Sequence, residues 1–195
     1  MREATIHRKT LETDVRLALG LDGSGKTNVQ TNCGFLDHML TLFAAHALFD
    51  LEIFAAGDIQ VDDHHLVEDV GIVLGSAIAE ALGEKKGIRR YGSMLLPMDE
   101  ALVLCALDLS GRSELVWGLT LPTQKVGTFD TELGEEFFRA VSRSGAMTLH
   151  FQQFSGKNSH HILEAAFKAF GHALGEAVSM DPQRAEAVPS TKGVL

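Results

Sequence analysis

The sequence predicts an α+β fold made of two copies of one unit, each with helices on one face of a sheet. The segment DHHLVE at residues 63–68 recurs as SHHILE at residues 159–164, 96 positions later in a chain of 195 residues. Each copy opens a stretch in which apolar residues follow helical spacing, and each half begins with strand-like segments. Strands with helices gathered behind them, in the same order twice, favour an α+β arrangement.

The first half predicts strands, a helix, a strand and a second helix. Residues 5–20 alternate polar and apolar side chains, as strands with one buried face do, and DGSG at residues 22–25 is a strong turn. Helical spacing then covers residues 36–49, a short strand follows at 51–55, and a second helix runs from the HH doublet to Gly83.

The second half repeats this order. Its predicted strands and helices are residues 101–109, 114–121, 132–142, 147–151 and 162–174. We place the two halves at residues 1–93 and 94–180, with the join near residues 91–97. The tail, residues 181–195, is short and polar and contains proline, so we expect it on the surface.

Composition and charge exclude several classes of protein. Fractions of 45% hydrophobic and 22% charged residues are those of a globular chain rather than a disordered one. A formal charge of −9, from 17 Lys+Arg and 26 Asp+Glu, argues against a nucleic-acid partner. The longest uncharged stretch, residues 70–79, is too short to cross a membrane, and no signal peptide is expected. Cys33 and Cys105, at no metal-site spacing, fit a reduced cytoplasmic protein.

The segment GLDGSGKT at residues 20–27 matches the phosphate-binding P-loop pattern G-x-x-x-x-G-K-S/T. A P-loop holds phosphate at the N-terminus of a helix that begins at the lysine. Residues 28–34 (NVQTNCG) are polar and lack helical spacing, so no helix is expected there. We therefore interpret residues 22–25 as a hairpin turn between two strands.

Histidine is the unusual residue, because four of the nine histidines form the two HH doublets. Side chains at i and i+4 of a helix lie on one face, whereas neighbours diverge by about 100°. His64 and Glu68 are therefore predicted to chelate one metal ion while His65 faces another. The second doublet repeats the pattern with His160, His161 and Glu164. Two sites follow, each with a chelating pair from one copy and a single histidine from the other. Imidazole and carboxylate ligands suit Zn, Mn, Fe, Co or Ni.

A simpler alternative is that the doublets are solvated helix N-termini, with Asp62 and Asp63 as helix caps. The recurrence of the whole five-residue pattern disfavours this alternative. His46 and His172 lie on apolar stretches. We therefore interpret them as packed or surface residues rather than metal ligands.

Six segments carry a family resemblance. They are FLDHML at 35–40, DDHHLVED at 62–69, MDEA at 98–101, DLSGR at 108–112, NSHHILEAAFK at 158–168 and PSTKG at 189–193. In this order they resemble imidazoleglycerol-phosphate dehydratase of histidine biosynthesis, over residues 5–195. No room remains for the histidinol-phosphatase domain that some relatives carry, so the resemblance implies the monofunctional form.

The resemblance implies a fold, an assembly and a reaction. The fold is a four-stranded sheet backed by two helices on one face, duplicated, as in domain 2 of ribosomal protein S5. The assembly is a shell of 24 subunits built from trimers, with active sites between subunits and two Mn²⁺ ions per site. The reaction is the dehydration of D-erythro-1-(imidazol-4-yl)glycerol 3-phosphate to 3-(imidazol-4-yl)-2-oxopropyl phosphate (imidazole-acetol phosphate) by a cytoplasmic hydro-lyase.

The resemblance also implies roles for individual residues. It places His64, Glu68 and His161 on one ion and His38, His65, His160 and Glu164 on the other. It makes Glu12 the acid/base, so that the predicted catalytic residues are Glu12, His38, His65, Glu68 and Glu164. Glu12 also contacts the substrate, whose phosphate is predicted to bind Arg90, Arg112, Lys168, Ser190 and Lys192.

One position departs from the family pattern. Many relatives have His where this chain has Glu136, and by the duplication Glu136 is the counterpart of His38. We predict that Glu136 is the fourth ligand of the first ion. The alternative is that Glu136 lies on an exposed helix face and that water or His150 completes the site.

Two other functions stay open at this point. A two-metal phosphoesterase also uses His/carboxylate pairs and basic phosphate ligands, and bridging carboxylates would favour it. A metal-storing or structural shell protein predicts metal uptake without turnover, and it gives no reason for Arg90, Arg112 and Lys192.

Overall fold

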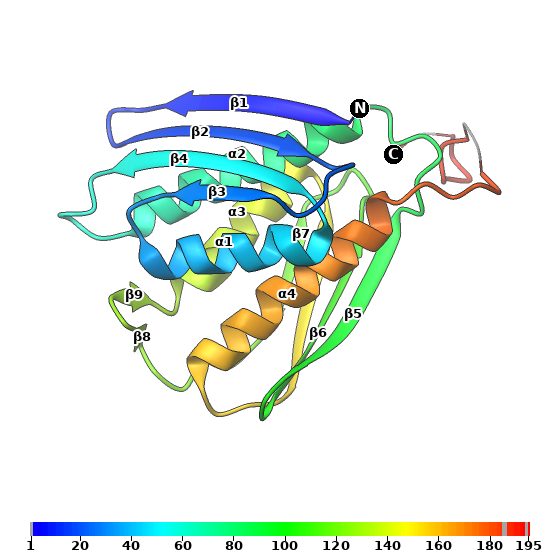
Figure 1. Cartoon of the computed structure of the whole chain (residues 1–195). Helices are drawn as coiled ribbons and strands as arrows, with labels where there is room; N and C mark the ends of the chain where they lie inside the picture. The colour runs from blue at the N-terminus through cyan, green and yellow to red at the C-terminus, as the bar shows by residue number, and fades with distance from the viewer. Residues whose placement is uncertain (1, 185–186, 194) are drawn as a thin grey trace.

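The computed structural model describes residues 2–184, 187–193 and 195, and these residues form four layers. A four-stranded sheet covers each outer side, and two pairs of helices lie between the sheets (Figure 1). Each sheet therefore has its helices on one face, as the sequence predicts.

The first half supplies one sheet and two helices. Its elements are β1 (Glu3–Lys9), β2 (Thr13–Gly20), β3 (Thr27–Gln30), α1 (Gly34–Ala47), β4 (Asp50–Gly57) and α2 (His64–Leu82). The sheet order is β1-β2-β4-β3, and only the β3–β4 pair is parallel. The buried residues that alternate along β2, which packs against α2, are Thr13, Val15, Leu17 and Leu19. The predicted alternation is confirmed.

The second half has the same topology. Its elements are β5 (Tyr91–Met98), β6 (Ala101–Asp108), β7 (Glu114–Gly118), α3 (Leu133–Gly145), β10 (Thr148–Ser155) and α4 (Ser159–Val178), with the small β8 (Lys125–Val126) and β9 (Phe129–Asp130) pair before α3. The sheet order is β5-β6-β10-β7, and only the β7–β10 pair is parallel. The same order and pairing directions in both sheets confirm the duplication.

The helices join the two halves, because α1 packs on α4 and α2 packs on α3. Gly75 on α2 and Gly171 on α4, 96 residues apart, allow the close approach at equivalent positions. A Cβ at Gly75 would lie 2.6 Å from the Val141 carbonyl oxygen, and one at Gly171 would lie 2.6 Å from that of Phe43. This packing sets how side chains on α1 and α4 face one another.

The segment predicted as the join, residues 91–97, lies in β5. Only Gly92 and Leu96 of this segment are buried, so its apolar alternation is too weak to indicate a strand from sequence. The boundary at residue 93 therefore falls inside the first strand of the second sheet.

The glycine-rich segment at residues 20–27 is a turn between β2 and β3, and no helix begins at Lys26. The predicted turn is present, but it does not close a hairpin, because β3 pairs with β4 rather than with β2. The backbone amides of Ser24 and Lys26 donate to the Asp50 carboxylate at 2.8 and 3.0 Å. These amides are therefore engaged within the chain rather than turned toward a phosphate.

The two cysteines, Cys33 and Cys105, are buried and free. Burial raises the pKa of the Cys33 thiol to about 11 and also raises the pKa of Cys105. Within the described part of the chain, no helix is both long enough and apolar enough to cross a membrane.

Candidate active site

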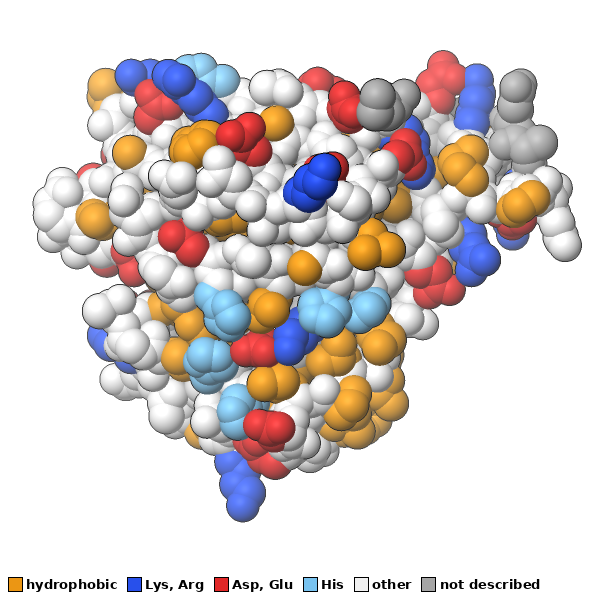
Figure 2. Space-filling model, viewed as in Figure 1, with side chains coloured by type: hydrophobic (Ala, Val, Ile, Leu, Met, Phe, Trp, Pro, Cys, Tyr) orange, Lys and Arg blue, Asp and Glu red, His pale blue; other side chains and the backbone are white. Residues whose placement is uncertain are grey.

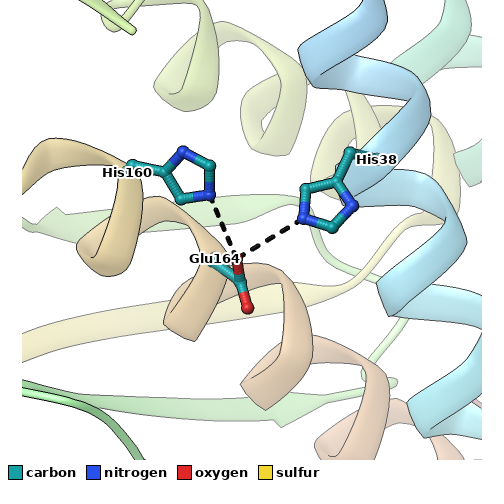
Figure 3. Close-up of side chains that lie close together, drawn as sticks. All are labelled: His38, His160 and Glu164. Atoms are coloured by element: carbon teal, nitrogen blue, oxygen red, sulfur yellow. Dashed lines mark hydrogen bonds and ion pairs between the residues drawn. The ribbon is translucent and has the colours of Figure 1, made fainter.

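Helices α1 and α4 bring together His38, His160 and Glu164 (Figure 3). Glu164 Oε2 lies 3.1 Å from His160 Nε2 and 3.5 Å from His38 Nε2. The Glu164 side chain is only 8% exposed, whereas both imidazole rings reach solvent. The helical pairing of residues i and i+4 that the sequence predicts is present for His160 and Glu164.

This cluster has the composition of a metal site. Its three donor atoms all lie within 4.8 Å of one another. Two imidazole nitrogens and a carboxylate oxygen are ligands that suit first-row divalent metals. Figure 2 shows histidine side chains gathered on the surface over α1 and α4, with an acidic and a basic side chain among them. The residues therefore fit a divalent ion that solvent and a small substrate can reach.

Lys168 follows Glu164 by one turn of α4 and donates a hydrogen bond to the other carboxylate oxygen, Oε1. Burial alone raises the pKa of the Glu164 carboxyl, but the hydrogen bond and charge of Lys168, together with His160 and His38, outweigh burial and bring this pKa below its usual value. Glu164 is therefore an anion near neutral pH. The Lys168 side chain is 17% exposed and lies at the edge of the cluster.

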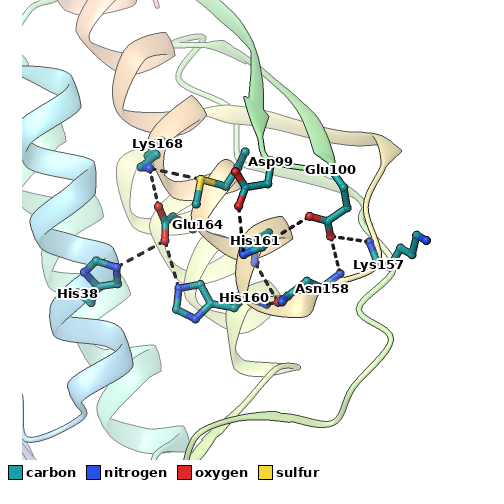
Figure 4. Close-up of polar contacts among 10 residues, drawn as sticks. His38, Asp99, Glu100, Lys157, Asn158, His160, His161, Glu164 and Lys168 are labelled. Carbon is teal, nitrogen blue, oxygen red and sulfur yellow. Dashed lines mark hydrogen bonds and ion pairs between the residues drawn. The ribbon is translucent and has the colours of Figure 1, made fainter.

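The second doublet is held at the N-terminus of α4 (Figure 4). Asn158 caps this helix, since its side-chain oxygen accepts from the His160 and His161 amides at 2.9 and 3.4 Å. Glu100, in the turn between β5 and β6, accepts from His161 Nδ1 at 2.7 Å and from the Lys157 and Asn158 amides at 3.1 and 2.9 Å. These hydrogen bonds, chiefly that from His161, lower the pKa of Glu100 to about 2, and Glu100 raises the pKa of His161.

The first doublet lies at the N-terminus of α2. His65 Nδ1 is 3.0 Å from Asp58 Oδ2 and 3.8 Å from Glu12 Oε2. The hydrogen bond to Asp58 is the main cause of a raised pKa of His65. The side chain of Glu12 is 55% exposed. The amide of His64 donates to Asp62 at 2.8 Å, whereas Asp63, the N-cap residue of α2, makes no side-chain cap hydrogen bond, so of the two caps in the alternative interpretation only Asp62 contacts the helix N-terminus.

Not all predicted metal ligands meet. Of the four ligands predicted for one ion, the structure brings together all but His65. Of the other set, Glu68 follows His64 by one turn of α2, and Glu136 lies on α3 with its Oε1 3.9 Å from Arg139 Nε. Among the described residues, His38, His160 and Glu164 are the one group of three or more metal donors that lie together.

The predicted phosphate ligands lie in separate places. Lys168 borders the metal cluster, whereas Arg90 and Ser190 line a hollow of about 450 Å³ between the start of β5 and the tail. Arg90 is 13% exposed, and its guanidinium donates to Asp108 at 2.7 Å and to the Pro189 carbonyl oxygen at 2.8 Å. Arg90 therefore anchors the tail.

Two further predicted ligands are accessible. The Lys192 amide donates to Ser190 Oγ at 3.2 Å, and the Lys192 side chain is exposed. Arg112 is also exposed, in the turn that follows β6. Among residues 2–184, 187–193 and 195, no hydrogen bond or ion pair joins either side chain to the metal cluster.

Sequence reasoning missed several partners of the histidines. Asp58 accepts a hydrogen bond from His65, and Glu100 accepts one from His161, the second histidine of each doublet. Of these two carboxylates, only Glu100 stood out in the sequence, because it lies in the MDEA segment. His46 on α1 and His172 on α4 meet with 3.0 Å between Nδ1 and Nε2. Their contact depends on the pairing of α1 with α4, which no local pattern indicates.

Comparison with known proteins gives consistent matches. A family model described as imidazoleglycerol-phosphate dehydratase matches residues 31–174. Curated proteins of that name from Jannaschia sp. and Ruegeria pomeroyi are 57% and 58% identical over 195 residues, which cover 100% of both chains in each case. The solved imidazoleglycerol-phosphate dehydratase from Staphylococcus aureus has a TM-score of 0.84 and 43% identity, over 92% of this chain and 99% of that chain. The one from Pyrococcus furiosus has a TM-score of 0.84 and 39% identity, over 97% and 100%.

Proposed function

The chain belongs to the imidazoleglycerol-phosphate dehydratase family, and we propose that it uses divalent metal ions to dehydrate D-erythro-1-(imidazol-4-yl)glycerol 3-phosphate. The product is 3-(imidazol-4-yl)-2-oxopropyl phosphate, and the reaction belongs to histidine biosynthesis. The cluster of His38, His160 and Glu164 carries the proposal, because its donors suit a divalent ion and it lies open on the surface.

Two Mn²⁺ ions per active site are part of this proposal. The proposed ligands are His38, His65, His160 and Glu164 for one ion, and His64, Glu68, Glu136 and His161 for the other. Mixed imidazole and carboxylate donors support a metal such as Mn²⁺. When bound, the ions would act as Lewis acids on the imidazole ring of the substrate and would help to orient it.

Glu12 moves the proton in the proposed mechanism. The C2 hydrogen of the substrate lies next to no carbonyl group, so the protein has to place a general base beside it. The carboxylate of Glu12 lies 3.8 Å from His65, beyond hydrogen-bond distance, and is exposed. Asp58 holds His65 instead, which leaves the Glu12 carboxylate available to a substrate.

The cations bind the phosphate group of the substrate. A phosphate dianion requires several fixed cations and donors, because each hydrogen bond to it is charge-assisted. Lys168 supplies one cation beside the metal cluster. The remaining proposed ligands, in or near the tail, are Arg90, Arg112, Ser190 and Lys192.

A second subunit completes the proposed site. Within one chain, His65 and Glu12 do not join the cluster on α1 and α4. The second sheet carries exposed apolar side chains, including Leu95 on β5, Val116 on β7 and Phe154 on β10, and exposed apolar patches commonly mark protein contacts. We propose trimers that assemble into a cytoplasmic shell of 24 subunits, with active sites between subunits.

An assay with defined metal content tests this function. The purified protein is stripped with a chelator and supplied with Mn²⁺ and imidazoleglycerol phosphate, and both the dehydrated product and inorganic phosphate are measured. We expect dehydration to stop on chelation and to return with Mn²⁺, without release of phosphate. Release of phosphate would favour a two-metal phosphoesterase, and metal uptake without turnover would favour a metal-storing shell.

A further inference from the structure

Glu100 and Glu12 occupy equivalent places in the two halves. Glu12 directly precedes β2, and Glu100 directly precedes β6, the corresponding strand of the second sheet. Each carboxylate lies near the second histidine of the doublet in its own half. Glu12 is 3.8 Å from His65 Nδ1, and Glu100 is 2.7 Å from His161 Nδ1. The duplication therefore includes a carboxylate directed at each of these histidines.

The two carboxylates nevertheless have different partners. In the first half, Asp58 accepts the hydrogen bond from His65 at 3.0 Å and Glu12 is left exposed. In the second half, Glu100 itself binds His161 through Oε2 (Figure 4). Its other oxygen, Oε1, accepts two backbone amides at the start of α4, at 3.1 and 2.9 Å. Both oxygens of Glu100 are therefore occupied, and their orientation is fixed.

We propose that Glu100 is a positioning residue that keeps the ring hydrogen of His161 on Nδ1, so that Nε2 can bind a metal ion. This assignment rests on the proposed metal sites. A neutral imidazole carries one hydrogen, and the partner of one ring nitrogen decides whether the other can be a ligand. Asp99 Oδ2 forms an ion pair with His161 Nε2 at 3.7 Å, a separation longer than a hydrogen bond, so the hydrogen bond that fixes the ring is the one from Nδ1 to Glu100.

The same contacts give Glu100 and Glu12 different tasks in one reaction. Glu12 is free to exchange a proton with a substrate, whereas Glu100 is held by a histidine and by the backbone. Of the two carboxylates that the duplication provides, one serves as acid/base and the other orients a metal ligand.

The variant Glu100→Gln reverses the hydrogen bond without changing the shape of the side chain. The amide oxygen of Gln keeps the two backbone amides, which turns its NH₂ group toward His161 Nδ1. An NH₂ group can only donate, so Nδ1 has to accept and the ring hydrogen moves to Nε2. We expect Mn²⁺ to bind about 10 to 100 times more weakly at this site. Titration of the metal-free protein, with free Mn²⁺ followed by electron paramagnetic resonance, measures this change without an activity assay.

The variant Glu100→Ala separates positioning from anchoring. Alanine removes the anchors of α4 but leaves Nδ1 free to donate to water. Positioning predicts that Gln weakens Mn²⁺ binding more than Ala does, although Ala lowers the Tm of the metal-free protein more. A role confined to anchoring α4 predicts that Ala has the larger effect on both quantities. Glu80→Gln removes an exposed carboxylate from the last turn of α2 and is the control for loss of charge.

The outcomes distinguish this inference from the proposed function. Wild-type Mn²⁺ affinity in Glu100→Gln, or weaker binding in Glu100→Ala than in Glu100→Gln, overturns the positioning role and leaves the dehydratase function intact. Failure of the unmodified protein to take up any divalent ion overturns the proposed metal dependence and this assignment with it.

Discussion

Lys168 donates a hydrogen bond to Glu164 Oε1, the carboxylate oxygen that faces away from His38 and His160. Glu164 therefore faces the other two members of the metal-binding cluster, His38 and His160, through one oxygen. Through its other oxygen it contacts Lys168, the cation proposed to bind the substrate phosphate. His160, Glu164 and Lys168 follow one another at intervals of four residues along α4, so one helix face carries both ends of the proposed site.

Replacing Lys168 by Met should affect both ends of this face. Loss of a charge-assisted hydrogen bond to phosphate, about 1.5–3 kcal/mol, should raise the KM for imidazoleglycerol phosphate about 10-fold or more. Lys168 also lowers the pKa of the Glu164 carboxyl, so this pKa should rise in the variant. The anionic form of Glu164 should then be lost at a higher pH than in the unmodified protein.

The carboxyl signal of Glu164 in the metal-free protein, followed by NMR against pH, isolates the second effect of Lys168→Met, because the histidine ligands, which ordinarily titrate at about pH 6.5, dominate the pH dependence of metal binding. We expect the pKa of Glu164 to be higher in the variant than in the unmodified protein. An unchanged pKa would mean that Lys168 does not stabilise the anionic form of Glu164.

Lys192→Ala should act on substrate binding alone. The Lys192 side chain is exposed in the tail, and its amide binds Ser190. We expect the KM to rise with kcat little changed, because the lost contact with phosphate stabilises the bound substrate and the transition state equally. We expect the metal content to be unchanged. Steady-state kinetics together with metal analysis checks this prediction. Unchanged kinetics, or loss of metal, would contradict the role proposed for the tail.

Glu136→Gln tests the proposed fourth ligand of the ion that His64, Glu68 and His161 are proposed to bind. Gln is nearly isosteric with Glu but is a poorer metal ligand, so one metal ion per subunit should bind more weakly and activity should fall steeply. Glu135→Gln is the matched control, because Glu135 is the neighbouring carboxylate on α3 and also contacts Arg139. Full metal content and activity in the Glu136 variant would show that Glu136 is not a ligand.

Removal of metal should dissociate the assembly, because the proposed ligands come from more than one subunit. Ligation across an interface adds the free energy of metal binding to that of association. Size-exclusion chromatography after chelation should show small oligomers, and added Mn²⁺ should restore the large species. A large shell that survives verified metal removal would refute this coupling.

The parts of the site that lie on one helix could be predicted from sequence, because the i to i+4 relationship depends only on helix geometry. His160 and Glu164 are the clearest case. The contact of His38 with this pair depends on the packing of α1 against α4, between residues more than 100 positions apart, and no local pattern indicates it. Only the family resemblance predicted that His38 binds the same ion as His160 and Glu164.

The contributions of turns were harder to predict. Asp58 and Glu100 reach the doublets from loops that follow or join strands, where side-chain spacing has no fixed period. The strand β5 was not predicted, for a different reason. Its exposed residues Tyr91 and Leu95 are apolar, so the strand lacks the alternation of polar and apolar side chains that indicates a strand.

The central claim is that His38, His160 and Glu164 hold a divalent ion that the dehydratase needs. Anomalous scattering near the manganese absorption edge, from crystals of the active Mn²⁺-loaded protein, locates the ions directly. We expect a strong peak in contact with His38 Nε2, His160 Nε2 and a Glu164 carboxylate oxygen, and a second peak at the other proposed set of ligands. An active, Mn²⁺-dependent protein with no peak at His38, His160 and Glu164 would contradict the account.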